Sequence, residues 1–272
     1  MMVTVILFRV VGGDMSKEVL SLEYGEGVAS LLFNRPEARN AMNPAMRDAL
    51  MAQLDSLAAD DAIRTVVLRG RGGSFVAGGD LQAFAETLAL SREDRRKNFR
   101  QRVSLSSGLV QRLVTFPKPL VAVVEGDVAG AGISIVLCCD FVLATEAARF
   151  SFSHARVGLP LDLGLSYFLP RAVGNLQARR LAMSAARIGA EEACRLGLAT
   201  SLVAGNQLET GLAELLEGLV AMPGTAITAI KREFRDAASA TLEDQLALEA
   251  DLVGDCAATE AFEQRVASFV NR

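Results

Sequence analysis

The order in which apolar runs, glycine-rich turns and helical periodicity follow one another constrains the fold of this chain most strongly. Residues 28–33 and 65–68 are short apolar or β-branched runs that end at loops rich in proline or glycine, which predicts strands. Between them, apolar residues recur at helical spacing over 44–59, after Asn43 as N-cap and Pro44 as first helical residue. The same order returns further along the chain, at 92–114 (helix), 120–124 (strand) and 132–138 (helix). Repeated strand, turn and helix units predict an α/β core.

Composition excludes several classes of protein. With 272 residues and 51% hydrophobic content the chain can bury a large core, and its net charge of −4 without a long basic run argues against a nucleic-acid partner. The four cysteines match neither a disulfide framework nor a zinc site, which favours a reducing cytoplasm. The apolar run at 3–11 is too short to span a bilayer, so we expect no membrane partner.

The chain divides into three regions. Glycine becomes rare after about residue 224, and apolar residues then recur helically over 225–238, 241–253 and 257–270. We therefore predict an N-terminal extension at 1–14, a core at 15–205 and a helical C-terminal subdomain at 206–272. The helices of this subdomain cannot cover all of each other's apolar faces, so we expect them to dock on the core or on another subunit.

Two glycine-rich turns are the most informative segments for function. Residues 74–81 and 125–132 each follow a predicted strand and lead into a helix. Small residues let the backbone approach a ligand, and N–H groups that enter a helix point toward anionic oxygen. Two such turns can direct two N–H donors at one oxygen, as an oxyanion hole requires, although each could also be only a tight loop. Neither turn has the lysine or the glycine spacing of a P-loop or a Rossmann fingerprint.

These turns belong to a set of motifs that resembles the enoyl-CoA hydratase/isomerase (crotonase) family over nearly the whole chain. The motifs, in order, are residues 34–37 (NRPE), 40–42 (NAM), 75–81 (FVAGGDL), 117–119 (PKP), 126–132 (GDVAGAG) and 139–140 (CD). The resemblance implies an α/β fold with a crotonase-like β-spiral core of repeated ββα units. It also implies a C-terminal helical subdomain that assembles homotrimers or hexamers.

The resemblance also implies the binding residues. The backbone N–H groups of Gly79 and Ala131 would donate to the thioester oxygen of an acyl-CoA substrate. No metal and no tightly bound cofactor are expected, since the substrate is carried as a CoA thioester. The residues expected along the CoA moiety are Arg39, Asn40, Ala41, Ala77, Leu81 and, across a subunit interface, Lys231, for which a place on a solvated helix is an equally good interpretation.

The sequence departs from the hydratase pattern at the positions that activate water. Where hydratases of the family carry two glutamates, this chain has Ser134 and His154, which we consider pocket residues rather than certain catalytic ones. Asp162 aligns instead with the acid of the phenylacetate-pathway ring isomerases, which the run 158–174 also resembles. Hydration needs both an acid and a base, whereas one carboxylate is sufficient to move a proton along a dienolate. The resemblance therefore favours double-bond isomerisation of an enoyl-CoA with Asp162 as the acid/base, possible substrates including cyclic or aryl-derived acyl groups.

Alternatives remain open. Hydration is disfavoured but belongs to the same family, and Asp162 could act as the nucleophile of an aryl-CoA lyase or dehalogenase, although those relatives place a tryptophan where His154 stands and this chain contains none. A catalytically silent scaffold or RNA-associated homologue is the non-enzymatic alternative. Cys138 and Cys139 lie in an apolar helix and are expected in the core rather than at the site.

Overall fold

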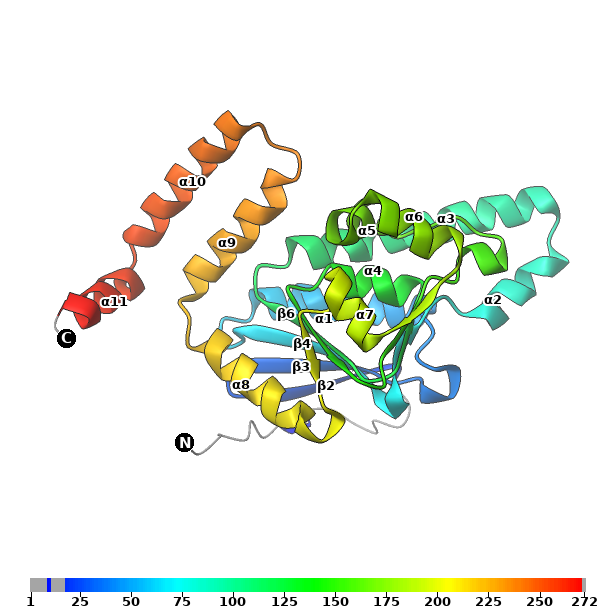
Figure 1. Cartoon of the computed structure of the whole chain (residues 1–272), viewed down its shortest axis with the longest axis horizontal. Helices are drawn as coiled ribbons and strands as arrows, with labels where there is room; N and C mark the ends of the chain where they lie inside the picture. Colours follow the sequence, from blue (N-terminus) through cyan, green and yellow to red (C-terminus); the bar gives the residue numbers. More distant parts are fainter. Residues whose placement is uncertain (1–8, 11–17, 271–272) are drawn as a thin grey trace.

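The computed structural model describes residues 9–10 and 18–270. Its main sheet has the strand order β1-β2-β3-β4-β6-β8-β11 within the described residues, and the strands from β3 onward pair in parallel. The bounds of these strands are β1 Arg9–Val10, β2 Leu20–Gly25, β3 Val28–Phe33, β4 Thr65–Gly70, β6 Leu120–Val124, β8 Phe141–Thr145 and β11 Ser201–Val203. Figure 1 shows this sheet at the centre of the molecule.

A second, smaller sheet has the order β10-β9-β7-β5. Its strands are β5 Ser74–Ala77, β7 Asp127–Ala129, β9 Arg149–Ser151 and β10 Arg187–Gly189. The chain passes from a strand of the large sheet to a strand of the small sheet and then into a helix, three times in succession: β4 to β5, β6 to β7, and β8 to β9. This repeated ββα unit is the β-spiral that the resemblance to the crotonase family implied.

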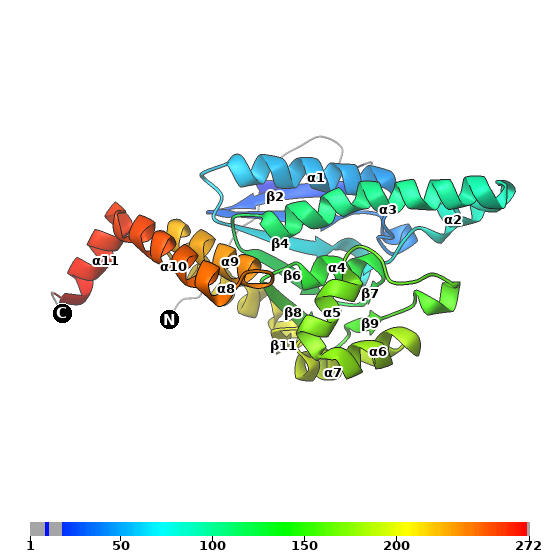
Figure 2. The same ribbon diagram turned by 90° about the horizontal axis from the view of Figure 1, so that it is seen from above.

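Helices cover both sheets (Figure 2). Their bounds are α1 Pro44–Ala59, α2 Leu81–Glu86, α3 Arg92–Thr115, α4 Ala131–Leu137, α5 Leu165–Val173, α6 Asn175–Met183, α7 Ala190–Leu196, α8 Leu208–Val220, α9 Gly224–Ala237, α10 Leu242–Ala257 and α11 Glu260–Val270. The predicted start of α1 is confirmed, because the Asn43 side chain accepts from the Met46 N–H at 2.9 Å and Pro44 follows it. The helices predicted at 92–114 and 132–138 agree with α3 and α4 to within a residue.

The buried core lies on both faces of the large sheet. Most of it is one cluster between the two sheets and helices α1, α3, α4 and α5, in which Phe33 and Phe75 meet edge to face at 5.3 Å between ring centroids. A smaller cluster lies on the other face, where Leu208, Leu212 and Leu216 of α8 pack against valines of β3, β4 and β6. Helix α8 is therefore part of the core, and the segment that stands apart begins at α9, later than the predicted boundary at residue 206.

Helices α9 to α11 form an arm that extends away from the sheets (Figure 1). Two contacts fix its base to the segment before β6: the Thr228 hydroxyl donates to the Pro117 carbonyl at 2.8 Å, and the Lys231 ammonium donates to the Lys118 carbonyl at 2.8 Å. Beyond this base the arm exposes apolar side chains, among them Phe234, which is 79% exposed. The prediction of an incompletely covered helical tail is thus confirmed.

The N-terminal extension predicted at 1–14 lies outside the described residues except for Arg9–Val10, which pair as β1 with β2. Over residues 9–10 and 18–270, no single helix is long and apolar enough to cross a membrane. The α8 and α9 region passes this test only when residues 205–220 and 224–237 are taken together, and these two segments meet at 100°.

Candidate active site

The first glycine-rich turn is held from one side by the segment before α1. Met42 donates its N–H to the Gly78 carbonyl at 2.7 Å and accepts the Asp80 N–H at 3.3 Å. Met42 thus bonds to the residues on either side of Gly79. In a parallel bridge of this kind the N–H of the middle residue points away from the bridging strand. That residue is Gly79, and no acceptor for its N–H is found in the described part of the chain. The predicted donor is therefore available to a ligand.

The second turn places its donor at the start of a helix. Helix α4 begins at Ala131, whose N–H has no partner within the helix because the first turn of an α-helix leaves its amides unpaired. The helix also approaches β5 very closely. A Cβ on Gly132 would lie 2.2 Å from the Val76 carbonyl oxygen, so only glycine permits this approach.

The two turns are in direct contact. Gly130 has φ 48°, and a Cβ on it would lie 3.3 Å from the Cα of Gly78. The predicted convergence of the turns is consistent with this contact, since Gly79 and Ala131 each follow one of the touching glycines. The contact therefore brings the two predicted donors into neighbouring positions.

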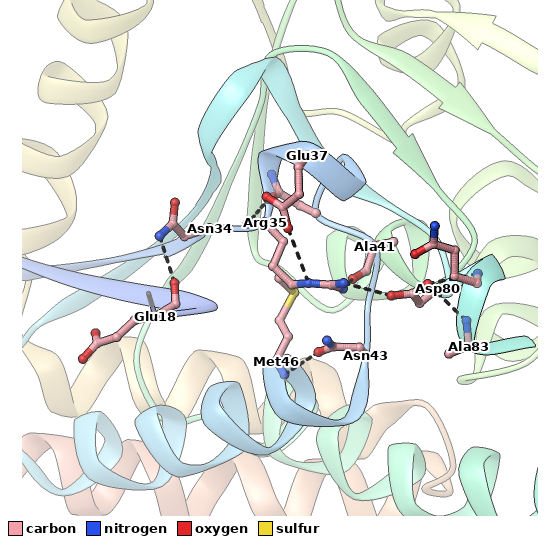
Figure 3. A network of polar contacts seen from close by, with 11 residues as sticks. Glu18, Asn34, Arg35, Glu37, Ala41, Asn43, Met46, Asp80 and Ala83 are labelled. Atoms are coloured by element: carbon pink, nitrogen blue, oxygen red, sulfur yellow. Dashed lines mark hydrogen bonds and ion pairs between the residues drawn. The ribbon is translucent and has the colours of Figure 1, made fainter. Parts of the chain in front are cut away.

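A largely buried ion pair between Arg35 and Asp80 stiffens the first turn (Figure 3). One guanidinium nitrogen of Arg35 contacts Asp80 Oδ2 at 2.9 Å and another donates to the Ala41 carbonyl at 2.6 Å. The other carboxylate oxygen of Asp80 accepts the backbone N–H groups of Gln82 and Ala83 and so caps α2. Burial favours a higher pKa for Asp80, but the bonds from Arg35 and from the two amides outweigh it and lower the pKa below its ordinary value.

We expect Asp80→Asn to destabilise the fold by about 1–3 kcal/mol, because it leaves a buried guanidinium without its counter-charge. The pKa of Asp80 is lower in the folded than in the unfolded chain, so its contribution is fully present above the unfolded pKa of about 4 and is lost as the pH falls through the folded pKa. Denaturant melts between pH 3 and pH 7 check this. The matched control is Asp55→Asn at the exposed pair with Arg112, for which we expect less than about 1 kcal/mol. A constant difference between wild type and Asp80→Asn down to pH 3 would contradict the assignment.

His154 connects the second turn to Asp162. Its Nε2 lies 3.2 Å from Asp162 Oδ1, and its ring atoms Cε1 and Nε2 would lie 3.8 and 3.9 Å from a Cβ on Gly130. The imidazole is buried, whereas the Asp162 side chain is 35% exposed. Within the described residues no partner is found for Asp162 Oδ2, so one carboxylate oxygen is held and the other can accept a proton.

The backbone after Asp162 is bent into an unusual conformation. Leu163 has φ 47° and Gly164 has φ 75°, and the Leu165 N–H donates back to the Asp162 carbonyl at 2.9 Å. A positive φ at a bulky residue such as leucine costs about 1–3 kcal/mol. The surrounding core compensates this strain, since Leu163 and Leu165 are buried. The bend fixes the place where the carboxylate meets His154.

The residues predicted along CoA all lie near the first turn, with one exception. Asn40 is fully buried, and its amide donates to the carbonyls of Arg71 and Ser74 at 2.9 and 2.7 Å, so it also holds this loop together. The Ala77 N–H donates to the Arg39 carbonyl at 3.1 Å, and Leu81 is exposed at the start of α2. Ala41 supplies the carbonyl that Arg35 binds.

Lys231 lies apart from these residues. It forms an ion pair with Asp140 Oδ2 at 2.7 Å and is largely buried at the base of the arm. The same Asp140 oxygen accepts the Leu120 N–H at 2.7 Å, so the pair joins α9 to the end of α4 and the start of β6. In this chain Lys231 thus has a structural partner, and its contact with CoA stays a prediction.

The remaining residues noted in the sequence lie in helix α4 or directly after it. Ser134 is 1% exposed, and its hydroxyl has no hydrogen-bond partner in the described part of the chain. Burial raises the pKa of the Cys138 thiol to about 12 and that of Cys139 well above its ordinary value, which disfavours the thiolate form that a nucleophile needs. In residues 9–10 and 18–270 no cluster of three or more His, Cys, Asp or Glu side chains could hold a metal ion.

Comparison with known proteins shows the family of this chain. The sequence model of the family described as enoyl-CoA hydratase/isomerase matches residues 23–272. The chain belongs to this family. It is 36% identical over 259 residues to a protein of Rhodobacter capsulatus named probable enoyl-CoA hydratase, covering 95% of this chain and 97% of that one. It is also 33% identical over 233 residues to the 1,2-epoxyphenylacetyl-CoA isomerase of Escherichia coli, covering 83% and 85%.

Solved structures of the enoyl-CoA hydratase/isomerase family share the fold. One of them, an enoyl-CoA hydratase/isomerase from Cupriavidus metallidurans CH34, superposes with a TM-score of 0.87 at 30% identity and covers 95% of each chain. The resemblance noted in the sequence is therefore confirmed for the family and for the fold. The chain is an enoyl-CoA hydratase/isomerase family enzyme acting on CoA thioesters.

Proposed function

We propose that this enzyme moves a double bond between positions 3 and 2 of an enoyl-CoA, with Asp162 as the acid and base. The observation that carries the proposal is which carboxylate oxygens around the two turns already have a hydrogen-bond partner. Asp80 is committed to Arg35 and to the cap of α2, whereas Asp162 has one oxygen on His154 and one without a partner in the described residues. A single available carboxylate suits proton transfer along a dienolate.

The proposed reaction has two proton transfers. The thioester oxygen accepts the N–H groups of Gly79 and Ala131, which stabilises negative charge on that oxygen. Asp162 removes a proton from C2 of the 3-enoyl group, and the electron pair moves onto the thioester oxygen to give the dienolate. The protonated Asp162 returns the proton to C4, and the double bond is left between C2 and C3. His154 positions the carboxylate through Nε2 and does not contact the reacting atoms.

Hydration is the second candidate, because relatives of the enoyl-CoA hydratase/isomerase family carry hydratase names, among them the 2,3-dehydroadipyl-CoA hydratase of Escherichia coli. By the resemblance in the sequence, the two positions that hold the hydratase glutamates are Ser134 and His154 here. Neither position therefore holds the carboxylate that shares the activation of water in hydratases, and the histidine is engaged with Asp162. Because Asp162 is, among the described residues, the one carboxylate available at the proposed site, isomerisation is favoured over hydration.

A panel of CoA esters tests the proposal. The purified enzyme is incubated with 3-enoyl-CoA and, separately, with 2-enoyl-CoA. The products are separated by chromatography and their masses are measured by mass spectrometry. Isomerisation gives a product of unchanged mass and the absorbance of a conjugated thioester, whereas hydration adds the mass of one water. Hydration of 2-enoyl-CoA without any isomerisation of 3-enoyl-CoA would overturn the proposal in favour of the second candidate.

We further propose that CoA lies along Arg39, Asn40, Ala41, Ala77 and Leu81.

We also propose that the arm α9–α11 docks on other copies of the chain in a trimer or a pair of trimers. The exposed apolar side chains of the arm support this assembly. Light scattering should give a particle of about three or six times 28.9 kDa, and Phe234→Asp should shift it toward the monomer. A stable wild-type particle of 28.9 kDa would contradict this proposal.

A further inference from the structure

Two phenyl rings and one guanidinium gather over the first turn, and we call Phe84, Phe99 and Arg102 the Arg102 cluster. The Phe84 ring lies directly on the turn, since its Cζ would be 2.7 Å from a Cβ on Gly79. The centroids of Phe84 and Phe99 are 5.1 Å apart, and the guanidinium carbon of Arg102 lies 5.0 Å from the first ring and 5.9 Å from the second. The cluster therefore adjoins the residue whose amide holds the thioester oxygen.

Arg102 is half-buried and lacks a counter-charge. In residues 9–10 and 18–270 no carboxylate lies within 4.0 Å of it, and its one hydrogen bond, to the Ala83 carbonyl, is long at 3.4 Å. Two other arginines of α3 have a carboxylate partner: Arg96 pairs with Glu93 and Arg112 with Asp55. A guanidinium has five N–H donors in a planar fork that matches a carboxylate. Most of the N–H donors of Arg102 thus have no acceptor in the described residues, and the Phe84 ring separates the guanidinium from Gly79.

We infer that the acyl group of the substrate carries a carboxylate at its far end, and that Arg102 recognises it. This inference rests on the proposed function, because it names the substrate class of the same site. The acyl chain would run from the thioester across the apolar faces of Phe84 and Phe99, and its terminal carboxylate would meet the guanidinium. The rings exclude water from the guanidinium on one side, which strengthens a charge-assisted bond.

The test compares two esters that differ only at the far end, 3-hexenoyl-CoA and its ω-carboxylated counterpart, in turnover assays with the full chain. Arg102→Met keeps an unbranched apolar stem but removes the charge and the donors. We expect it to lower kcat/KM for the carboxylated ester by about 10- to 100-fold and to change that for the neutral ester by less than about 3-fold. Arg102→Lys restores part of the loss. Arg100→Met is the matched control, because Arg100 is exposed on the same helix, and it should change neither value.

Calorimetry with the saturated analogues hexanoyl-CoA and adipoyl-CoA, and with CoA alone, gives the same comparison without turnover. Tighter binding of adipoyl-CoA that Arg102→Met abolishes supports the inference even if no isomerisation is seen, in which case only the proposed reaction fails. Equal loss of affinity for adipoyl-CoA, hexanoyl-CoA and free CoA would show that Arg102 binds a CoA phosphate, which overturns the inference. No discrimination between the two esters by the wild type overturns it as well, while the proposed isomerisation stands.

Discussion

Asp162→Asn should lower kcat for isomerisation of a 3-enoyl-CoA by about 100- to 10,000-fold, which is the contribution of a positioned general base. Asparagine has the shape of aspartate and retains an oxygen that can contact His154 Nε2, so the site should keep its geometry. It cannot take a proton at neutral pH. Because the thioester oxygen is bound by main-chain amides, the Kd of a saturated acyl-CoA should change by less than about 3-fold.

Stopped-flow absorbance for the chemical step and calorimetry for binding separate these two effects. Asp61→Asn, which makes the same change at an exposed position between α1 and β4, is the matched control and should leave both values unchanged. A fully active Asp162→Asn enzyme would reject the proposed role of this residue. Accumulation of an ester on Asp162 of the wild type would favour nucleophilic catalysis instead.

Ala131→Pro should remove the second oxygen-binding donor and lower kcat by about 100- to 1000-fold, as loss of one donor does in other oxyanion holes. Proline lacks the N–H, and its fixed φ suits the first position of a helix, which is where Ala131 lies. The substitution therefore removes a donor that the helix itself does not use. The loss should be in kcat more than in KM, since charge on the oxygen develops mainly in the transition state.

Ala131→Ser is the matched control, because it adds a small side chain and retains the N–H. It should keep kcat within about 10-fold of the wild type, and thermal melts should show that both variants are folded. A folded Ala131→Pro enzyme with unchanged kcat would place the oxyanion hole elsewhere.

Local patterns in the sequence predicted the elements that depend on neighbouring residues. The N-cap at Asn43, the strand at 120–124 and the two glycine-rich turns follow from spacing and side-chain size alone. They predicted two turns with unpaired amides, because a turn entering a helix has such amides wherever it occurs. The assignment of the donors to Gly79 and Ala131 came from the resemblance to the family.

Contacts between distant segments could not be predicted in this way. Arg35 and Asp80 are 45 positions apart, and their pairing depends on the bridge between Met42 and Gly79 that brings the two loops together. The sequence also gave no sign that His154 would hold Asp162, because the bend at Leu163 has a backbone conformation that leucine rarely adopts. The one available signal for the ion pair was an aspartate directly before a helix, which is a typical cap.

The contact between Gly78 and Gly130 divides the site into two halves of different chemical character. The half proposed to hold the thioester oxygen is made of peptide groups, from the backbone of Gly79 and Ala131. The half proposed to move the proton is made of the side chains of Asp162 and His154. A side-chain substitution in the second half should therefore change turnover more than the affinity for an unreactive acyl-CoA, and a change of reaction within this scaffold needs new side chains in one half only.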